Sequence, residues 1–200
     1  VTLSAVQGEL TTANNERDVF IEVADKKEKI LLLASVSHPD IGAIQQAIES
    51  NENYELTFST VPFTGKWADY TAVILYQLPS EDGAGTAETD AALKQNIPRL
   101  FVTGSQTNVT LFNRLNAGIT INGNNKKTNQ VFPSAEKNFS LFSVSDETFS
   151  GINVLPPMNS PFGDYRFSAA NSVLLSQKIG SVNSGIPLWT FNETEGTRTA

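Results

Sequence analysis

The sequence contains no cysteine among its 200 residues, a single histidine, and no long apolar run. Without cysteine there is no disulfide, no iron–sulfur cluster, no thiolate zinc site and no thiol nucleophile. A cysteine-free chain suits an oxidising compartment as well as a reducing one. The longest apolar run, Ile30 to Ala34, is far shorter than the roughly 20 residues of a membrane-spanning helix, so no such helix is predicted.

Basic residues are also few and scattered. Lys and Arg number 14 against 21 Asp and Glu, which gives a net charge of −7. The basic runs do not exceed pairs such as Lys26-Lys27 and Lys126-Lys127. Because nucleic-acid binding depends on clustered cations that neutralise phosphates, we expect no nucleic-acid partner.

The remaining composition fits one domain with a small appendage, since 40% of the residues are hydrophobic. Residues 1–25 contain two short β-prone runs joined by a polar stretch and predict a β-hairpin. A hairpin is marginal alone, so we interpret it as the remnant of an upstream β-sandwich domain. Residues 26–29 read as a linker, and residues 30–200 as the main domain. Its last strand, starting at Thr197, stops at Ala200, so we expect the domain to be truncated there.

Apolar runs alternate with helical patterns in the first part of the main domain. This alternation predicts parallel strands with crossover helices, hence a doubly wound, mostly parallel α/β sheet. After residue 118 short β-prone runs predict added antiparallel strands. The expected elements are strands at 30–34, 54–61, 72–76 and 99–103, helices beginning at Asp40, at 86–95 and at 107–115, and later strands at 118–121, 139–144, 173–182 and 188–191.

Residues 29–104 carry a family resemblance. They read Lys-Ile-Leu-Leu-Leu-Ala at 29–34, His-Pro-Asp at 38–40, Tyr-Thr-Ala-Val-Ile-Leu-Tyr-Gln-Leu-Pro-Ser at 70–80, and Ile-Pro-Arg-Leu-Phe-Val-Thr-Gly at 97–104. This resembles the class I glutamine-amidotransferase-like, flavodoxin-like fold. It looks most like a divergent branch in large membrane-anchored bacterial envelope proteins, where the domain follows an immunoglobulin-like sandwich. The resemblance implies a periplasmic location, and as partners the neighbouring domains of the same parent chain or another protein.

The amidotransferase chemistry itself is not expected. That class uses a cysteine at the turn after the Pro-led strand, activated by a histidine and oriented by a glutamate. Here the turn reads Val102-Thr103-Gly104-Ser105-Gln106, and the C-terminal half contains no histidine. We therefore expect a non-catalytic binding or assembly domain, a pseudoenzyme that releases no ammonia from glutamine.

Ser105 and His38 define an enzymatic alternative. Ser105 lies at a strand-to-helix turn of the kind that exposes nucleophiles, and His38 at the end of the first strand is the base it would need. The structural interpretation, in which Ser105 or Thr107 caps the following helix, is favoured, because Ser and Thr are preferred caps.

His38-Pro39-Asp40 also resembles the strand-end motif of zinc-dependent deacetylases of N-acetylglucosamine derivatives. This chain continues Ile41-Gly42 and has no second histidine, so three protein ligands are hard to assemble. We expect no metal; Pro39 and Asp40 instead suit the start of a helix. Nor do we expect a cofactor, because the glycines of the nearby loops lack the Gly-x-x-x-x-Gly-Lys-Ser pattern.

The Pro-rich segment 156–163 is the candidate partner-binding region. It reads as a long irregular loop, and such loops are often functional, so Pro157, Met158 and Phe162 are the candidate contact residues. A carbohydrate-binding module is a further alternative, which requires aromatic side chains exposed on one face; core packing is favoured for each of them. The aromatic candidates are Trp67, Tyr70, Phe162, Tyr165, Phe167 and Trp189.

Overall fold

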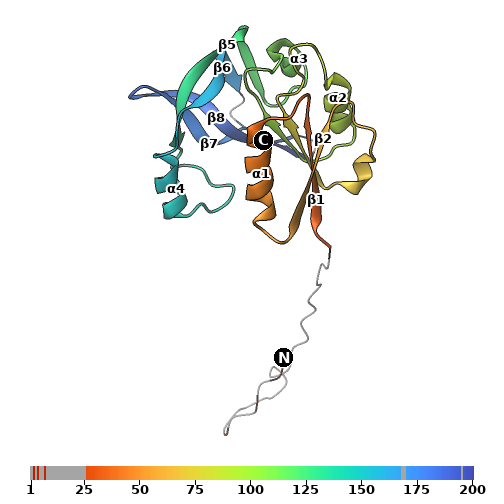
Figure 1. The fold of residues 1–200 in the computed structure, drawn as a ribbon. Helices are drawn as coiled ribbons and strands as arrows, with labels where there is room; N and C mark the ends of the chain where they lie inside the picture. The colour runs from red at the N-terminus through yellow and green to blue at the C-terminus, as the bar shows by residue number, and fades with distance from the viewer. Residues whose placement is uncertain (1, 3, 5–6, 8–25, 168–169, 195) are drawn as a thin grey trace.

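The computed structural model describes residues 2, 4, 7, 26–167, 170–194 and 196–200. The hairpin predicted over residues 1–25 lies outside this part, apart from three single residues, and stays a prediction. The described strands form one nine-stranded sheet in the order β2-β1-β3-β4-β9-β8-β7-β5-β6. Figure 1 shows the shorter strands with helices α1 to α3 at one end and the long strands β5 to β8 at the other.

Parallel pairing defines the first half of the sheet. Strand β1 pairs with β2 and β3, β3 pairs with β4, and β4 meets the short strand β9 through Arg99 and Thr199. The elements of this parallel half are β1 (Glu28–Ala34), α1 (Pro39–Glu49), β2 (Tyr54–Thr60), η1 (Trp67–Asp69), β3 (Ala72–Tyr76), α2 (Thr86–Lys94), β4 (Arg99–Val102), α3 (Val109–Asn113) and β9 (Thr197–Thr199).

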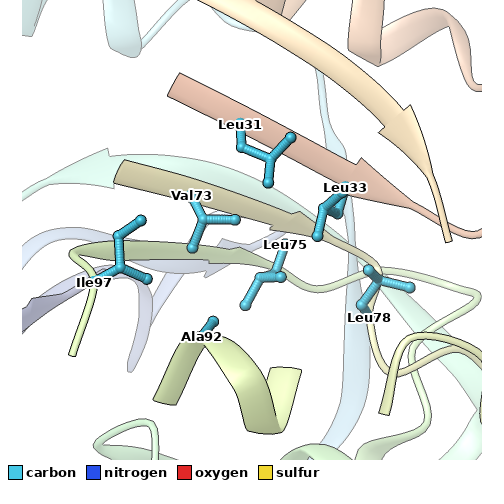
Figure 2. Close-up of a cluster of buried hydrophobic side chains, with 7 residues drawn as sticks. All are labelled: Leu31, Leu33, Val73, Leu75, Leu78, Ala92 and Ile97. Atoms are coloured by element: carbon cyan, nitrogen blue, oxygen red, sulfur yellow. The ribbon is translucent and has the colours of Figure 1, made fainter. Parts of the chain in front are cut away.

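Helices cover both faces of β1 and β3. Successive side chains of a strand point to opposite faces, so the continuous apolar runs of these strands supply two cores. On one face, α2 contributes Ala92 to a buried cluster, shown in Figure 2. The cluster comprises Leu31, Leu33, Val73, Leu75, Leu78, Ala92 and Ile97. On the other face α1 packs through Ile41 against Leu32 and Ile74. Strands buried on both faces hold their ends firmly in place.

Antiparallel pairing defines the second half. Its elements are β5 (Ile119–Ala135), α4 (Asp146–Ile152), β6 (Met158–Phe167), β7 (Ser172–Ile179) and β8 (Val182–Thr194). The first part of β5 pairs with β6 and its last four residues with β7. Strands β7 and β8 are joined by a two-residue turn in which Gly180 has φ 59°, as tight hairpins require. Helix α4 buries none of its residues.

The predicted doubly wound, mostly parallel, flavodoxin-like sheet is therefore wrong. The described sheet is mixed, with four parallel and four antiparallel pairings. The chain is rich in strand, and its two longest elements, β5 and β8, span 17 and 13 residues. The strand–helix alternation ends with α3 at Asn113; beyond Gly118 long antiparallel strands follow, which need no crossover helix.

Two local predictions in the antiparallel half are also wrong. Segment 139–144, predicted as a strand, is a loop with bends at Leu141 and Phe142, and residues 158–163 of the predicted irregular loop 156–163 belong to strand β6. Proline is tolerated in an edge strand, which explains Pro161. Glycine allows β5 and β6 to approach closely, since a Cβ on Gly123 would lie 1.8 Å from the Phe162 carbonyl oxygen.

Within the described ranges, the helices are all too short or too polar to cross a lipid bilayer.

Candidate functional site

The order of the parallel strands reverses between β1 and β3. Strand β1 leads through α1 to β2 on one side, whereas β3 leads through α2 to β4 on the other. Open sheets bind ligands outside the carboxyl ends of parallel strands at such a reversal. His38 and Asp40 follow β1, Tyr76 ends β3 and Gln77 comes directly after it, so these four residues define the first candidate site.

His38, Asp40 and Tyr76 contact one another at this edge. The Tyr76 hydroxyl donates to Asp40 Oδ2 at 2.7 Å and lies 3.0 Å from His38 Nδ1. The Asp40 backbone N–H donates to the same His38 nitrogen at 3.2 Å, which makes His38 the N-cap of α1. The cap predicted at Asp40 is therefore at His38, and Pro39 opens the helix.

Burial governs the protonation of the Tyr76 hydroxyl. It raises the pKa of Tyr76 to about 12, and the hydrogen bond to Asp40 adds to the increase. Tyr76 is therefore a protonated donor at neutral pH. The imidazole of His38 is held from two sides, by the first turn of α1 and by the Tyr76 ring, whose centroid lies 5.5 Å away.

Gln77 connects the loop after β4 to the end of β3 by a hydrogen bond. Its backbone has a left-handed φ of 52°, an uncommon conformation for a residue other than glycine. Its side-chain oxygen accepts a hydrogen bond from the Gln106 N–H at 2.8 Å. Gly104 makes this approach possible, because a Cβ there would lie 2.7 Å from that oxygen. The turn that contains Ser105 is thus anchored by its neighbours.

The strands that precede Ser105 and His38 are not neighbours in the sheet. The two residues follow β4 and β1, which are separated by β3, so the ends of their strands lie about 10 Å apart at the usual strand spacing. Ser105 is exposed, and α3 is capped by Asn108, whose side chain accepts from the Leu111 N–H at 3.0 Å. Neither Ser105 nor Thr107 is the cap that the sequence predicted.

The glycine-containing loop after β3 is shaped by its own acidic residue. The Ser80 hydroxyl donates to Asp82 at 2.5 Å, and this bond holds the pKa of Asp82 below its usual value. Gly83 and Gly85 adopt left-handed φ angles of 83° and 81°, which glycine accepts without strain. Across the described residues, no group of three or more His, Asp or Glu side chains is placed to hold a metal ion.

A second candidate surface lies on the antiparallel half. Of the large apolar side chains that are exposed in the described part of the chain, all but Val36 and Tyr54 fall between residues 132 and 189. They include Met158 and Phe162, which are 38% and 46% exposed. Pro157 is exposed beside them. These three predicted contact residues lie on or next to β6, the strand at one edge of the sheet.

Four rings also gather between strand β8 and the loop after β5. We call Phe139, Phe142, Trp189 and Phe191 the aromatic cluster. Phe191 lies 5.6, 5.5 and 5.7 Å from the other three ring centroids, and Trp189 stacks on it at an interplanar angle of 22°. Trp189 and Phe142 remain 41% and 49% exposed.

The other predicted aromatic residues divide between core and surface. Trp67 and Tyr70 pack with Phe63 against the core beneath α2. Tyr165 is half-buried and donates to the Pro161 carbonyl at 2.6 Å. Phe167, like Phe162 and Trp189, is exposed.

The sequence analysis missed Tyr76 and Gln77, and three rings of the aromatic cluster. A signal existed for Tyr76, Gln77 and Phe191. A polar pair directly after a buried apolar run marks a strand end, and Trp189 and Phe191 are two residues apart, so both point to one face of a strand.

Comparison with known proteins gives little beyond this geometry. No family model matches the chain, and no curated protein matches it. Among solved structures, the chain is similar to alpha-L-fucosidase isoenzyme 2 from Paenibacillus thiaminolyticus, at 14% identity and a TM-score of 0.49. The match covers 87% of this chain and 29% of that one. The chain thus spans under a third of that enzyme's length, and the likeness is too weak to carry an argument.

Proposed function

We propose that this chain is a non-catalytic binding and assembly domain of a larger bacterial envelope protein. Its antiparallel half contacts neighbouring domains of the same parent chain. The envelope setting and the periplasmic location rest on the sequence resemblance at residues 29–104. The choice of surface rests on the geometry described above.

The uneven distribution of exposed apolar side chains gives the most direct support. Single exposed apolar residues are ordinary on any protein surface, whereas many exposed apolar residues on one half of a molecule favour that half as the interaction surface. Here residues 132–189 hold nearly all of them in the described part of the chain. Strand β6 adds a sheet edge whose outer backbone groups can pair with another strand.

The carboxyl edge of the parallel strands supports the non-catalytic part of the proposal. His38 Nδ1 accepts from the first turn of α1 and faces Tyr76. A general base must instead reach the proton that it removes, directly or through one water. Strand β3 lies between the ends of β1 and β4, which precede His38 and Ser105, and among the described residues no hydrogen bond joins these two side chains.

Calorimetry on the full-length parent protein tests this function. We expect the domain to unfold at a higher temperature within the parent than alone, because a docked neighbour stabilises the folded state. Replacing Met158→Ser and Phe162→Ser together should remove most of that difference, on the order of a few degrees, while leaving the isolated chain's transition nearly unchanged.

The matched control replaces the exposed apolar residues of the other half, Val36→Ser and Tyr54→Ser. It should preserve the difference between the parent and the isolated chain. If the control pair removed the difference and the β6 pair did not, the docking surface would lie on the parallel half and the proposal would be wrong.

A further inference from the structure

We infer that the aromatic cluster is a binding site for one ring of a neutral glycan. This inference rests on the proposed function and names a ligand for the same antiparallel half. The cluster is separate from Met158 and Phe162, which belong to the edge strand β6.

Two of the four rings, Trp189 and Phe142, leave a large part of their apolar surface toward solvent. Phe191 lies at the centre, and Phe139, Phe142 and Trp189 each contact it. Trp189 is nearly parallel to Phe191 and 41% exposed, and Phe142 stands at 89° to Phe191 and is 49% exposed. A pyranose presents a face of C–H groups that stacks on such a ring through apolar and weak C–H contacts.

The size of the exposed surface favours a small ligand over a protein. A fully exposed Trp or Phe side chain offers roughly 150–250 Å², so the exposed fractions of Trp189 and Phe142 amount to about 200 Å². A stable protein interface takes about 800 Å² from each partner. One or two sugar rings match the smaller area.

Close ring packing excludes a cation held in an aromatic cage. Such a cage needs a space between its rings, whereas the centroids here are separated by 4.8 to 5.7 Å, which is direct contact. A ligand must therefore lie on the cluster rather than inside it.

The charge of the adjoining segments disfavours an anionic ligand. Residues 136–147 and 189–193 contain the acidic residues Glu136, Asp146, Glu147 and Glu193 and the basic residue Lys137. Arg198 on β9 pairs with Glu193, with 3.7 Å between Nε and Oε2, which leaves acidic side chains in excess. Nucleic acids and acidic sugars would be repelled, since stacking of bases operates together with cations along the backbone. Carboxylates accept hydrogen bonds from the hydroxyl groups of a neutral sugar.

Tryptophan fluorescence gives a direct test, because Trp67 and Trp189 are the two tryptophans of the chain. In a Trp67→Phe background, Trp189 is the sole tryptophan reporter. Titration with maltohexaose, cellohexaose and chitohexaose should shift its emission saturably for at least one of them. Phe142→Ala should weaken that binding about tenfold, and Phe132→Ala, an exposed ring outside the cluster, should leave it unchanged.

Calorimetric titration of Trp189→Ala with the same hexasaccharide provides a second readout that needs no tryptophan. The Trp189→Ala variant should release no heat of binding, and its unfolding temperature should stay close to that of the wild-type chain. Three outcomes contradict the inference: no saturable shift with any of the three sugars, tighter binding of hexagalacturonate or tetramethylammonium, or equal loss of binding in the Phe132→Ala control. None of them bears on the docking of β6, which the paired Ser variants test separately.

Discussion

At the scale of single residues, the reactive side chains of His38 and Tyr76 make structural hydrogen bonds. The histidine caps the N-terminus of α1, and the tyrosine donates to Asp40 while remaining buried. The sequence singled out His38 and Asp40 because they follow an apolar run. The contact of Tyr76 with Asp40 could not be predicted, because it joins positions 36 residues apart and depends on β1 and β3 being neighbours.

The raised pKa of Tyr76 predicts a pH dependence of stability. The folded value of about 12 exceeds the ordinary value of 10.0, so the folded state binds the proton more tightly than the unfolded chain. The resulting stabilisation is fully present below pH 10 and is lost as the pH rises toward about 12. Urea unfolding of the wild type and of Tyr76→Phe at pH 8, 9, 10 and 11 measures this effect.

The wild type should lose stability relative to Tyr76→Phe once the pH passes about 10, and their difference should be constant below it. A difference that stayed constant across the whole range would show that Tyr76 has no raised pKa in the folded protein.

At the scale of elements, strands β5 and β6 depend on two facing glycines. Gly123 and Gly163 pair directly, and a side chain at either position would meet the opposite backbone. Strands β1 and β3 could be predicted, because continuous apolar runs indicate strands buried on both faces. Strand β6 could not, because Pro156-Pro157, Pro161 and Gly163 resemble a loop, and only its position at the edge makes them tolerable.

Alanine substitutions at Gly123 and Gly151 should distinguish the effect of close packing on stability from the effect of backbone freedom. Gly123→Ala would place a Cβ 1.8 Å from the Phe162 oxygen, so one strand must move, at a cost of about 1–3 kcal/mol of unfolding free energy. Gly151→Ala in α4, where nothing lies within 4 Å, should stabilise by about 0.4–1 kcal/mol. Chemical denaturation of both variants checks this pair; similar effects from the two would contradict the close approach of β5 and β6.

At the scale of the whole molecule, the two halves of the sheet differ in what they expose. The parallel half is covered by helices on both faces of β1 and β3, whereas the antiparallel half carries α4, which buries none of its residues. Local patterns identified the parallel strands. The mixed sheet was not predicted, because the strand–helix pattern was extended beyond the point where the pairing changes, and pairing is set by contacts distant in sequence.

The two edges of the same sheet allow the proposed function to be tested within one molecule. Strand β6 forms one edge and β2 the other, and β6 exposes Met158, Phe162 and Phe167 where β2 exposes Tyr54 as its one large apolar side chain. Hydrogen exchange followed by mass spectrometry, on the isolated chain and on the full-length parent, is the most direct measurement. We expect the amides of Met158–Phe167 to exchange at least about tenfold more slowly in the parent, equivalent to 1.4 kcal/mol of added protection, and those of Tyr54–Thr60 to be unchanged. Equal exchange of β6 in both proteins, or new protection confined to β2, would contradict a binding surface on the antiparallel half.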